Sequence, residues 1–273
     1  MGRCKWEDLP EDCLANVFRR ASVQSLLMDV PFVCKSWFRA SLHPFCWKLL
    51  DFNNIVFVLK DILFHVIFDD EGVRMVHILV VEYRIKEFFG NCVLLKFPAN
   101  GCNGDVLEFV AVKCPALRCL SFSCELFKND HLPIIQDLIK KCKQLEFLSI
   151  FYSRVTNLKE IVAHIALNCQ KFRGLSAPFA YIGEEEAAAI VTKLPNINYL
   201  ILVHSYIDRK YLVEILLGCK SLARLDVSYC CGFKVDDNLL ELASHIHTFK
   251  YEGAVDSFSH EDHFQLFDGY NSA

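Results

Sequence analysis

Cysteine and histidine are the residues whose chemistry could be most diagnostic here, since the 273-residue chain holds 14 Cys and 10 His. Thiolates and imidazoles at the right spacing bind zinc, and a thiolate beside an imidazole can act as a nucleophile. The sequence has no Cys-x-x-Cys pair, and the adjacent Cys230 and Cys231 have poor geometry for a disulfide. Neither a zinc finger nor a thioredoxin-type site is therefore indicated.

Other catalytic signatures are also absent from the sequence. It contains no phosphate-binding glycine loop, no His-Glu-x-x-His helix and no Gly-x-Ser-x-Gly elbow. His260, Glu261, Asp262 and His263 lie together near the C-terminus, but such a cluster in a polar tail is far more often solvent-exposed than bound to metal. We therefore predict no catalytic residue, no metal site and no cofactor.

Composition and charge limit the cellular compartment and the classes of partner that we expect. The N-terminus has no apolar signal-peptide core, so we expect reduced thiols in the nucleus and/or the cytoplasm. Hydrophobic residues make up 53% of the chain, and the formal net charge of −4 gives no reason to expect nucleic acid or a membrane as a partner. The most apolar run, residues 55–68, is too short to span a bilayer.

Several of the cysteines belong to a sequence motif that recurs from residue 114 onwards. The first copy reads Cys-Pro-Ala-Leu-Arg-Cys-Leu-Ser-Phe, and successive copies begin 28, 27, 25 and 25 residues apart. A period in this range around Leu-x-x-Leu-x-Leu is typical of leucine-rich repeats, in which a small buried Cys packs well. The copies begin at Cys114, Cys142, Cys169, Leu194 and Cys219.

Each repeat should contribute one strand and one helix, and each strand should pair with the next. We predict an α/β fold in which a short solenoid has parallel strands on its concave side and helices on its convex side. Leu95 lies 25 residues before Leu120, so a degraded repeat precedes the first clear one. The expected N-caps of the helices are Asp105, Asp130, Thr156, Gly183, Asp208 and Asp236.

The domain organisation follows from where this period starts and stops. We expect repeats over 91–250, preceded by a junction over 51–90 that contains a capping helix at 73–89. A turn is expected at 51–54. Residues 251–273 lose the period and form a C-terminal tail, and the sequence leaves open whether this tail is ordered.

Residues 1–50 differ in kind from the repeats and predict three short helices. Leu9-Pro10 opens the segment, Leu14, Val17 and Phe18 follow at helical spacing, and Trp47 closes it. Between them stands Val33-Cys34-Lys35-x-Trp37. This combination, over residues 6–48, resembles the F-box. Cys13 and Ala21 stand where that family more often has larger aliphatic residues.

The resemblance implies a surface that binds the Skp-type adaptor of a cullin–RING ubiquitin ligase. Val17, Val33, Trp37 and Trp47 are expected to form the local core instead, and each adaptor candidate could equally be a core residue of the three helices. The adaptor-binding candidates are Leu9, Pro10, Leu14, Phe18, Leu26 and Leu27.

An F-box followed by cysteine-containing repeats resembles the plant F-box/leucine-rich-repeat proteins. The resemblance implies the non-catalytic, substrate-recognition subunit of a Skp–cullin–F-box ubiquitin ligase, with transfer chemistry supplied by other subunits. The alternative is a repeat scaffold that binds a partner without a role in ubiquitin transfer. A small-molecule sensor and a Cys–His hydrolase have weaker support, because the arc is short and the sequence shows no Cys–His spacing signal.

The repeats also indicate where an unidentified target protein could bind. Side chains that flank the inner leucines point to the concave face, because side chains alternate along a strand. Large apolar groups gather there and suggest a binding surface, unless loops or the C-terminal tail cover them. The substrate-binding candidates are Phe147, Ser149, Phe151, Tyr199, Ile201, Arg224 and Asp226.

Overall fold

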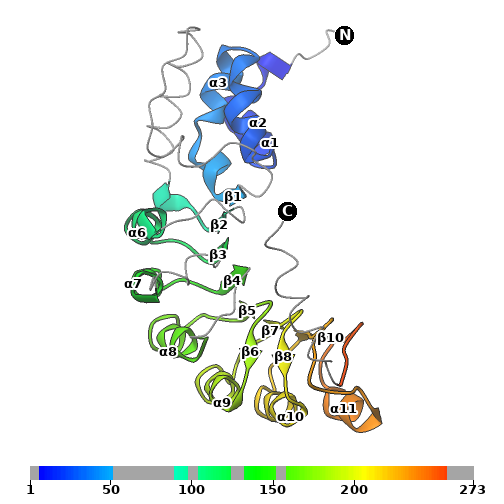
Figure 1. The fold of residues 1–273 in the computed structure, drawn as a ribbon. Coiled ribbons are helices and arrows are strands. Elements are labelled where there is room, and N and C mark those ends of the chain that lie inside the picture. Colours follow the sequence, from blue (N-terminus) through cyan, green and yellow to red (C-terminus); the bar gives the residue numbers. More distant parts are fainter. Residues whose placement is uncertain (1–5, 52–88, 98–103, 124–131, 152–157, 257–273) are drawn as a thin grey trace, which may run out of the picture. The chain divides into compact units, whose positions relative to one another are not determined.

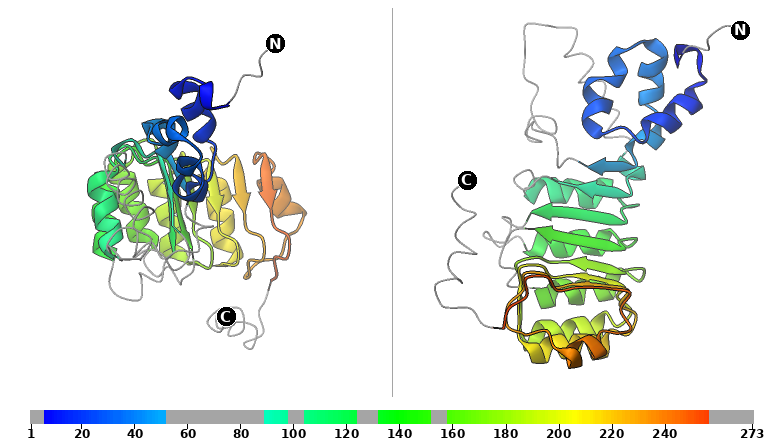
Figure 2. Two further views of the ribbon diagram at one scale, coloured as in Figure 1. Left: turned by 90° about the horizontal axis from the view of Figure 1, so that it is seen from above. Right: turned by 90° about the vertical axis from the view of Figure 1, so that its right-hand side faces the viewer.

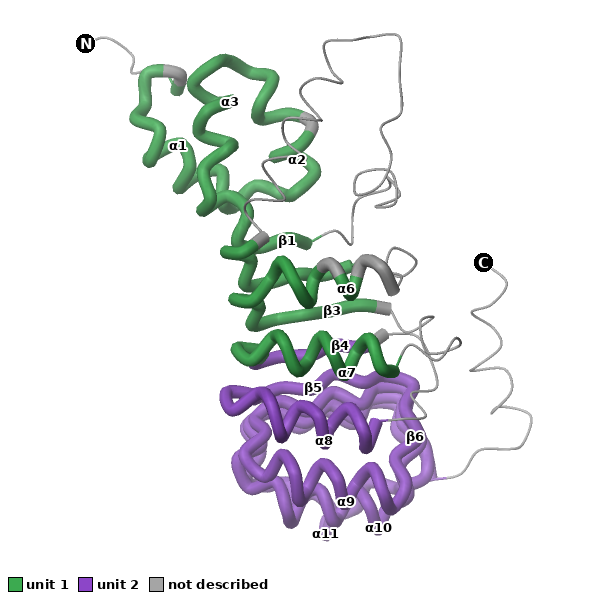
Figure 3. The backbone as a smooth tube through the Cα atoms, turned by 90° about the vertical axis from the view of Figure 1, so that its left-hand side faces the viewer, with its two compact units in different colours: residues 1–145 green, residues 146–273 purple. Residues whose placement is uncertain are grey.

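The computed structural model describes residues 6–51, 89–97, 104–123, 132–151 and 158–256 (Figure 1). The chain divides into two compact units, residues 1–145 and 146–273, which are described separately below (Figure 3). None of the described helices combines the length and the apolarity needed to cross a membrane. Four predictions lie outside the described residues: the helix at 73–89 except for its last residue, the caps Asp130 and Thr156, and the cluster at 260–263.

Unit 1 begins with short helices, as the sequence predicts. Glu11 and Asp12 occupy the first turn of α1, where a carboxylate is favoured by the helix dipole. The Ser22 hydroxyl accepts a hydrogen bond of 3.0 Å from the Ser25 N–H and so caps α2. Helix α1 packs against α3. The elements are η1 (Trp6–Asp8), α1 (Glu11–Phe18), α2 (Val23–Met28), η2 (Val30–Phe32), α3 (Lys35–Ser41) and η3 (Pro44–Trp47).

The rest of unit 1 is the start of the repeats. Strand β1 pairs in parallel with β2, and β2 pairs in parallel with β3, so that Leu50, Leu95 and Leu120 lie side by side in register. All three leucines are buried, which confirms the degraded repeat at Leu95. The elements are β1 (Leu49–Asp51), η4 (Phe89–Asn91), β2 (Leu94–Lys96), α6 (Gly104–Lys113), β3 (Cys119–Ser123) and α7 (Leu132–Lys141).

Two details of unit 1 differ from the sequence expectation. Asp51 was assigned to a turn, but it ends β1, because Leu50 can join the buried column only if the chain is extended there. Asp105 lies in the first turn of α6 and does not precede the helix.

Unit 2 carries the best-formed repeats. Its strands follow the order β4-β5-β7-β9-β10, and all four pairings are parallel. The strands form one layer and α8 to α11 form the other (Figures 1 and 2). The elements are β4 (Phe147–Phe151), α8 (Leu158–Asn168), β5 (Gly174–Ser176), β6 (Tyr181–Ile182), α9 (Glu184–Lys193), β7 (Tyr199–Ile201), β8 (Tyr206–Ile207), α10 (Arg209–Gly218), β9 (Arg224–Asp226), α11 (Asp237–Leu242) and β10 (Thr248–Lys250).

Three helices of unit 2, α9, α10 and α11, begin at the caps that the sequence predicts. The Asp208 carboxylate accepts a hydrogen bond of 2.9 Å from the Lys210 N–H, and Asp236 accepts one of 2.9 Å from the Leu239 N–H. At α9 the N-cap is Gly183, whose N–H donates to Glu186 Oε2 over 3.1 Å. These bonds satisfy backbone groups that a helix end otherwise leaves unpaired.

The repeat cysteines are buried where each helix turns back toward its strand. Cys114, Cys142 and Cys219 are fully buried, which confirms their role as small core residues. Cys142 Sγ lies 3.8 Å from the Cys114 carbonyl oxygen, so the thiol of one repeat touches the backbone of the previous one. Burial raises the pKa of the Cys219 thiol to about 11, because a thiolate would be poorly solvated there.

An aromatic residue with a left-handed backbone follows each of β5, β7 and β9. Phe179, His204 and Tyr229 have φ angles of 60°, 57° and 56°. The His204 ring stacks on Phe179 at 5.1 Å and on Tyr229 at 5.0 Å, both at an interplanar angle of 8°. We call these three residues the aromatic ladder. The next repeat ends it, because Gly253 brings its backbone against the Tyr229 ring.

The ladder predicts a pH dependence of stability. Burial lowers the pKa of His204 below its ordinary value of 6.5, so the unfolded chain takes up the proton first as the pH falls. Below pH 6.5 the free energy of unfolding should therefore decrease, and His204→Phe should remove that part of the decrease. Denaturant titrations of both proteins at pH 7.5 and 5.5 measure it. Equal pH dependence in the two proteins contradicts the prediction.

A second prediction concerns Gly232, which follows the adjacent cysteines. Its φ is +100°, and a Cβ added there would lie 2.6 Å from the Ile207 carbonyl oxygen. Gly232→Ala should lower the free energy of unfolding by about 2–3 kcal/mol, because backbone strain and a backbone contact add. Gly90→Ala is the matched control: a Cβ there meets nothing within 4 Å among the described residues, and the change should stay below about 0.5 kcal/mol. Equal effects in urea titrations would show that strain is not the cause.

Candidate functional site

The adaptor-binding candidates divide into buried and accessible residues. Leu14, Phe18 and Leu26 are buried among the short helices of unit 1, and the Phe18 ring meets the Trp37 ring edge-on at 4.9 Å. Leu9 and Leu27 are half-buried, and Pro10 is exposed. The structure thus offers Leu9, Pro10 and Leu27 for direct contact, whereas the three buried residues support the helices. Adaptor binding by any of the six stays a prediction.

The expected local core is wrong for two residues. Val17 is 45% exposed and Val33 is 58% exposed, whereas Trp47 is buried and its Nε1–H donates to the Ser41 carbonyl oxygen over 2.9 Å. The buried stripe of α1 consists of Leu14, Ala15 and Phe18, so Val17 falls outside it. Val33 follows the one-turn helix η2 and precedes α3, where the chain lies at the surface.

These exposed valines belong to a larger set of accessible apolar side chains in the helical segment. Trp37 is half-buried, and its Nε1–H is buried with no hydrogen-bond partner in the described part of the chain. An apolar surface of this kind on a small segment is typical of a protein-binding site. Large exposed apolar residues within this segment are Trp6, Val17, Phe32, Val33 and Phe45.

The second candidate surface is the side of the unit 2 sheet that faces away from the leucine core. We call it the strand face. Its residues form two rows, which follow from the observed register. The first row is Phe147, Gly174, Tyr199, Arg224 and Thr248, and the second is Ser149, Ser176, Ile201, Asp226 and Lys250. The structure thereby brings six of the seven substrate-binding candidates into neighbouring positions; Phe151 ends β4, but its side chain lies outside the described ones.

Exposure differs strongly along these rows. Tyr199 is 45% exposed, and Phe147 and Ile201 are half-buried, while Ser149 and Asp226 are buried. The Phe147 ring occupies the space that a side chain at position 174 would fill, and it reaches toward Tyr199. Apolar atoms thus form a continuous platform over β4, β5 and β7.

The β9–β10 end of the strand face is polar. Arg224 Nη2 lies 3.5 Å from Asp226 Oδ2, and Asp226 Oδ1 lies 2.8 Å from the Ser228 hydroxyl. The same hydroxyl lies 3.0 Å from Glu252 Oε2. Hydrogen bonds from the Glu252 backbone N–H and from Ser228 lower the pKa of Glu252, so this carboxylate is ionised at neutral pH.

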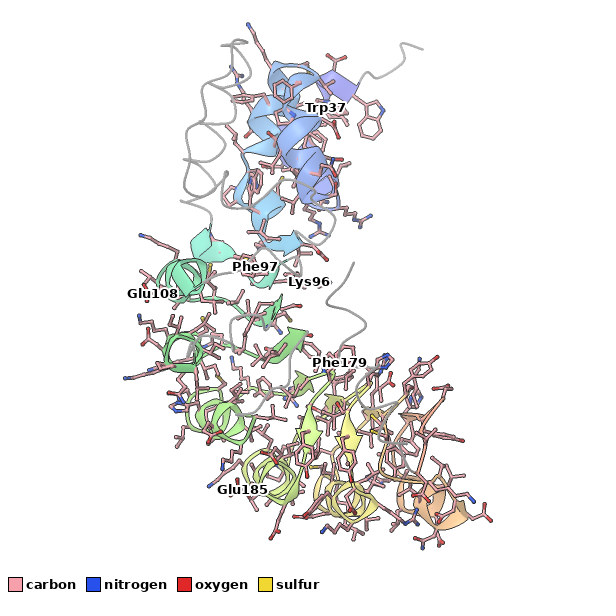
Figure 4. All side chains as sticks on the ribbon, in the orientation of Figure 1. Trp37, Lys96, Phe97, Glu108, Phe179 and Glu185 are labelled. Carbon is pink, nitrogen blue, oxygen red and sulfur yellow. The ribbon has the colours of Figure 1, made fainter. Side chains whose placement is uncertain are left out.

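Sequence reasoning missed the aromatic ladder, which borders the strand face. Figure 4 shows Phe179 on the strand side of unit 2 and Glu185 on the opposite, helical side. The 25-residue spacing of Phe179, His204 and Tyr229 was available as a signal, but an aromatic residue after a strand has no repeat consensus to match. Sequence reasoning also missed the contact of Ser228 with Asp226 and the contact of Ser228 with Glu252, which joins β9 to the segment after β10.

The described residues offer binding surfaces more readily than reactive centres. No three His, Cys, Asp or Glu side chains within the described ranges lie close enough together to hold a metal ion. The repeat thiols are buried, and burial keeps the pKa of Cys169 and Cys231 at about 11, which disfavours the nucleophilic thiolate.

Comparison with known proteins gives relatives over most of the chain. No protein-family profile matches the sequence. An F-box/LRR-repeat protein of Arabidopsis thaliana is 29% identical over 233 residues, which are 82% of this chain and 72% of the relative. The Arabidopsis F-box protein FBW2 is 25% identical over 86% of this chain and 71% of its own length. The Arabidopsis F-box protein SKIP1 is 24% identical over 82% of this chain and 79% of its own length.

Each of these relatives covers more than four-fifths of the chain. Two further observations agree with these relatives. The sheet of parallel strands has helices on one side, and residues 6–48 carry the motif that runs from Leu-Pro to Trp. The chain is therefore similar, over most of its length, to the F-box and F-box/LRR-repeat proteins of Arabidopsis thaliana.

Proposed function

We propose that this protein is the substrate-recognition subunit of a Skp–cullin–F-box ubiquitin ligase. The observation that carries the proposal is the joining, in one chain, of the folded F-box-like segment to leucine-rich repeats with an accessible strand face. Relatives named as F-box proteins over more than four-fifths of the chain support it. The chain supplies binding at both surfaces, and other subunits supply the transfer chemistry.

The adaptor contact is assigned to the accessible apolar residues of the helical segment. Pro10, with the half-buried Leu9 and Leu27, begins this surface, and the exposed Val17 and Val33 enlarge it. Leu14, Phe18 and Leu26 act by holding the helices in place. Burial of such a surface against a partner is favourable by about 25 cal/mol per Å² of apolar area.

The target contact is assigned to the strand face, with Phe147, Tyr199 and Ile201 as its apolar part and Arg224 as its exposed charge. This division of labour corresponds to an F-box over 1–50, a junction over 51–90, repeats over 91–250 and a tail over 251–273. The competing function is a repeat scaffold that binds a partner and recruits no ligase. Adaptor binding separates the two functions, because a scaffold has no use for it.

The purified chain should bind a Skp-type adaptor in a pull-down. The double variant Val17→Lys, Val33→Lys should weaken this binding at least about tenfold, because it places two charges in the apolar contact without touching the core. Leu167→Lys is the control for an added charge, since Leu167 is an exposed apolar residue on α8, outside the helical segment. A wild type that does not bind removes the ligase function, and a double variant that binds normally removes only the contact assignment.

The double variant Leu14→Ala, Phe18→Ala should lose adaptor binding by a different route. Both side chains are buried, so each truncation should cost about 2–5 kcal/mol of stability and loosen the helical segment. Circular dichroism should then show a loss of helical signal together with the loss of binding. Full helicity combined with lost binding would instead make these residues direct contacts, and retained binding would contradict both roles.

A further inference from the structure

We propose that the strand face recognises a target segment in which an acidic side chain stands beside an apolar one, and that Arg224 is the anchor for the carboxylate. This inference rests on the proposed function, because it names the chemistry of the target at the same surface. Its basis is a guanidinium with unused donors next to an aromatic platform.

Arg224 holds hydrogen-bond donors that the described part of the chain does not use. Its Nε–H is buried and has no hydrogen-bond partner there, and the ion pair that it forms within the described ranges, from Nη2 to Asp226 Oδ2, is as long as 3.5 Å. The Arg224 side chain is nevertheless 42% exposed, so the N–H groups that a binding partner can reach are those of its Nη atoms. A carboxylate approaching along the guanidinium edge can accept from two N–H groups at once.

Asp226 cannot itself accept the unused guanidinium hydrogen bonds, because its carboxylate is already hydrogen-bonded to Ser228. It is buried, and its Oδ1 accepts from both the backbone N–H of Ser228, at 3.3 Å, and the Ser228 hydroxyl, at 2.8 Å. These bonds hold the carboxylate below the surface and leave only Oδ2 facing Arg224. Asp226 therefore orients the guanidinium, whose side chain stays 42% exposed, toward the outside of the strand face.

The residue next to Arg224 in the first row defines the apolar half of the site. Tyr199 is its register partner on β7, and neighbouring strands lie about 4.8 Å apart. Beyond Tyr199 lies the Phe147 ring, which covers Gly174. An apolar side chain adjacent to the acidic one can thus lie on Tyr199 and Phe147 while the carboxylate meets Arg224. Arg224 and the apolar residues beside it therefore favour a target segment in which an acidic residue is adjacent to an apolar one.

The charges at this end of the face favour a carboxylate over a phosphate. Arg224 and Lys250 are opposed by Asp226 and Glu252 within the same two strands and the residues after them, so the local charge sums to zero. A single carboxylate can accept hydrogen bonds from the unused guanidinium donors. A doubly charged phosphate would also meet the repulsion of the two carboxylates.

A peptide selection tests the proposal without knowledge of the target. Random nine-residue peptides displayed on phage are selected on the immobilised full chain, on Arg224→Gln and on Lys193→Gln. Lys193→Gln makes the same charge change on the exposed last turn of α9, in the helix layer. We expect Asp or Glu beside an apolar residue to be enriched on wild type and Lys193→Gln, and the acidic preference alone to disappear on Arg224→Gln.

The best peptide then gives the affinity by fluorescence polarisation. Arg224→Gln should weaken binding about tenfold, the worth of one charge-assisted hydrogen bond, and a peptide with the acid replaced by its amide should lose the same factor on wild type but little on the variant. Unchanged melting temperatures show that the variants fold. A phosphoserine in place of the acid should bind more weakly.

Other results would overturn the inference. A selection without acidic residues, or one enriched in Lys or Arg, would contradict it, and so would tighter binding of phosphoserine. Peptides recovered only after residues 257–273 are removed would make that segment the occupant of the strand face. Adaptor pull-down on the same proteins separates the two levels. If the adaptor binds and the selection fails, only the acidic–apolar recognition is wrong; if the adaptor does not bind, the ligase function is wrong whatever the peptides show.

Discussion

The burial of one repeat's leucines against the next repeat is the constraint on which the structure depends. Leu148, Leu175, Leu200 and Leu225 are fully buried and lie in register across unit 2. A single strand and helix cannot bury such a column alone, so each repeat is stable only with its neighbours. The side chains on the opposite side of the strands lie in fixed rows outside the leucine column. Some of them, such as Tyr199, are exposed and available for recognition, whereas Ser149 and Asp226 are buried.

The backbone outside the leucine column is held in register by small or unusual residues. The repeat cysteines let a helix turn back close to the previous repeat, as the contact from Cys142 Sγ to the Cys114 carbonyl shows. At the other end of the strands the ladder residues adopt left-handed backbone conformations, and the N–H of Phe179 and of His204 donates to Val203 and Ser228 of the next repeat. Stacking of the rings offsets part of the cost of these conformations.

Much of the fold could be predicted because it is periodic. The columns of leucines, the small residues such as Cys219, and the caps at Asp208 and Asp236 each repeat a local rule, and the structure confirms them. The early strand at Leu49–Asp51 could not be found in this way, because it has no complete repeat around it. Its place is decided by pairing with β2, which is a tertiary effect.

The candidate sites were less predictable, since exposure depends on how elements pack and not on residue type. Val17 and Leu14 look alike in the sequence, yet only Leu14 lies on the stripe that α1 presents to α3. Likewise, alternation along β9 places Arg224 and Asp226 on one face, but it cannot say that Ser228 draws Asp226 inward and leaves the guanidinium under-used. Which of several polar side chains pair with one another depends on their positions in the folded chain, and the sequence does not give these positions.

The ring of Phe147 lies over Gly174, so the side chains at these two positions on neighbouring strands compete for the same space. A side chain at 174 and a large ring at 147 exclude each other, so a bulky residue can be carried by either strand but not by both. Exchanging the two, with a small residue on β4 and a large one on β5, would move the apolar platform by one strand spacing toward Arg224. Related proteins could thereby shift the distance between the apolar and the charged feature that they recognise, while the leucine column beneath stays unchanged.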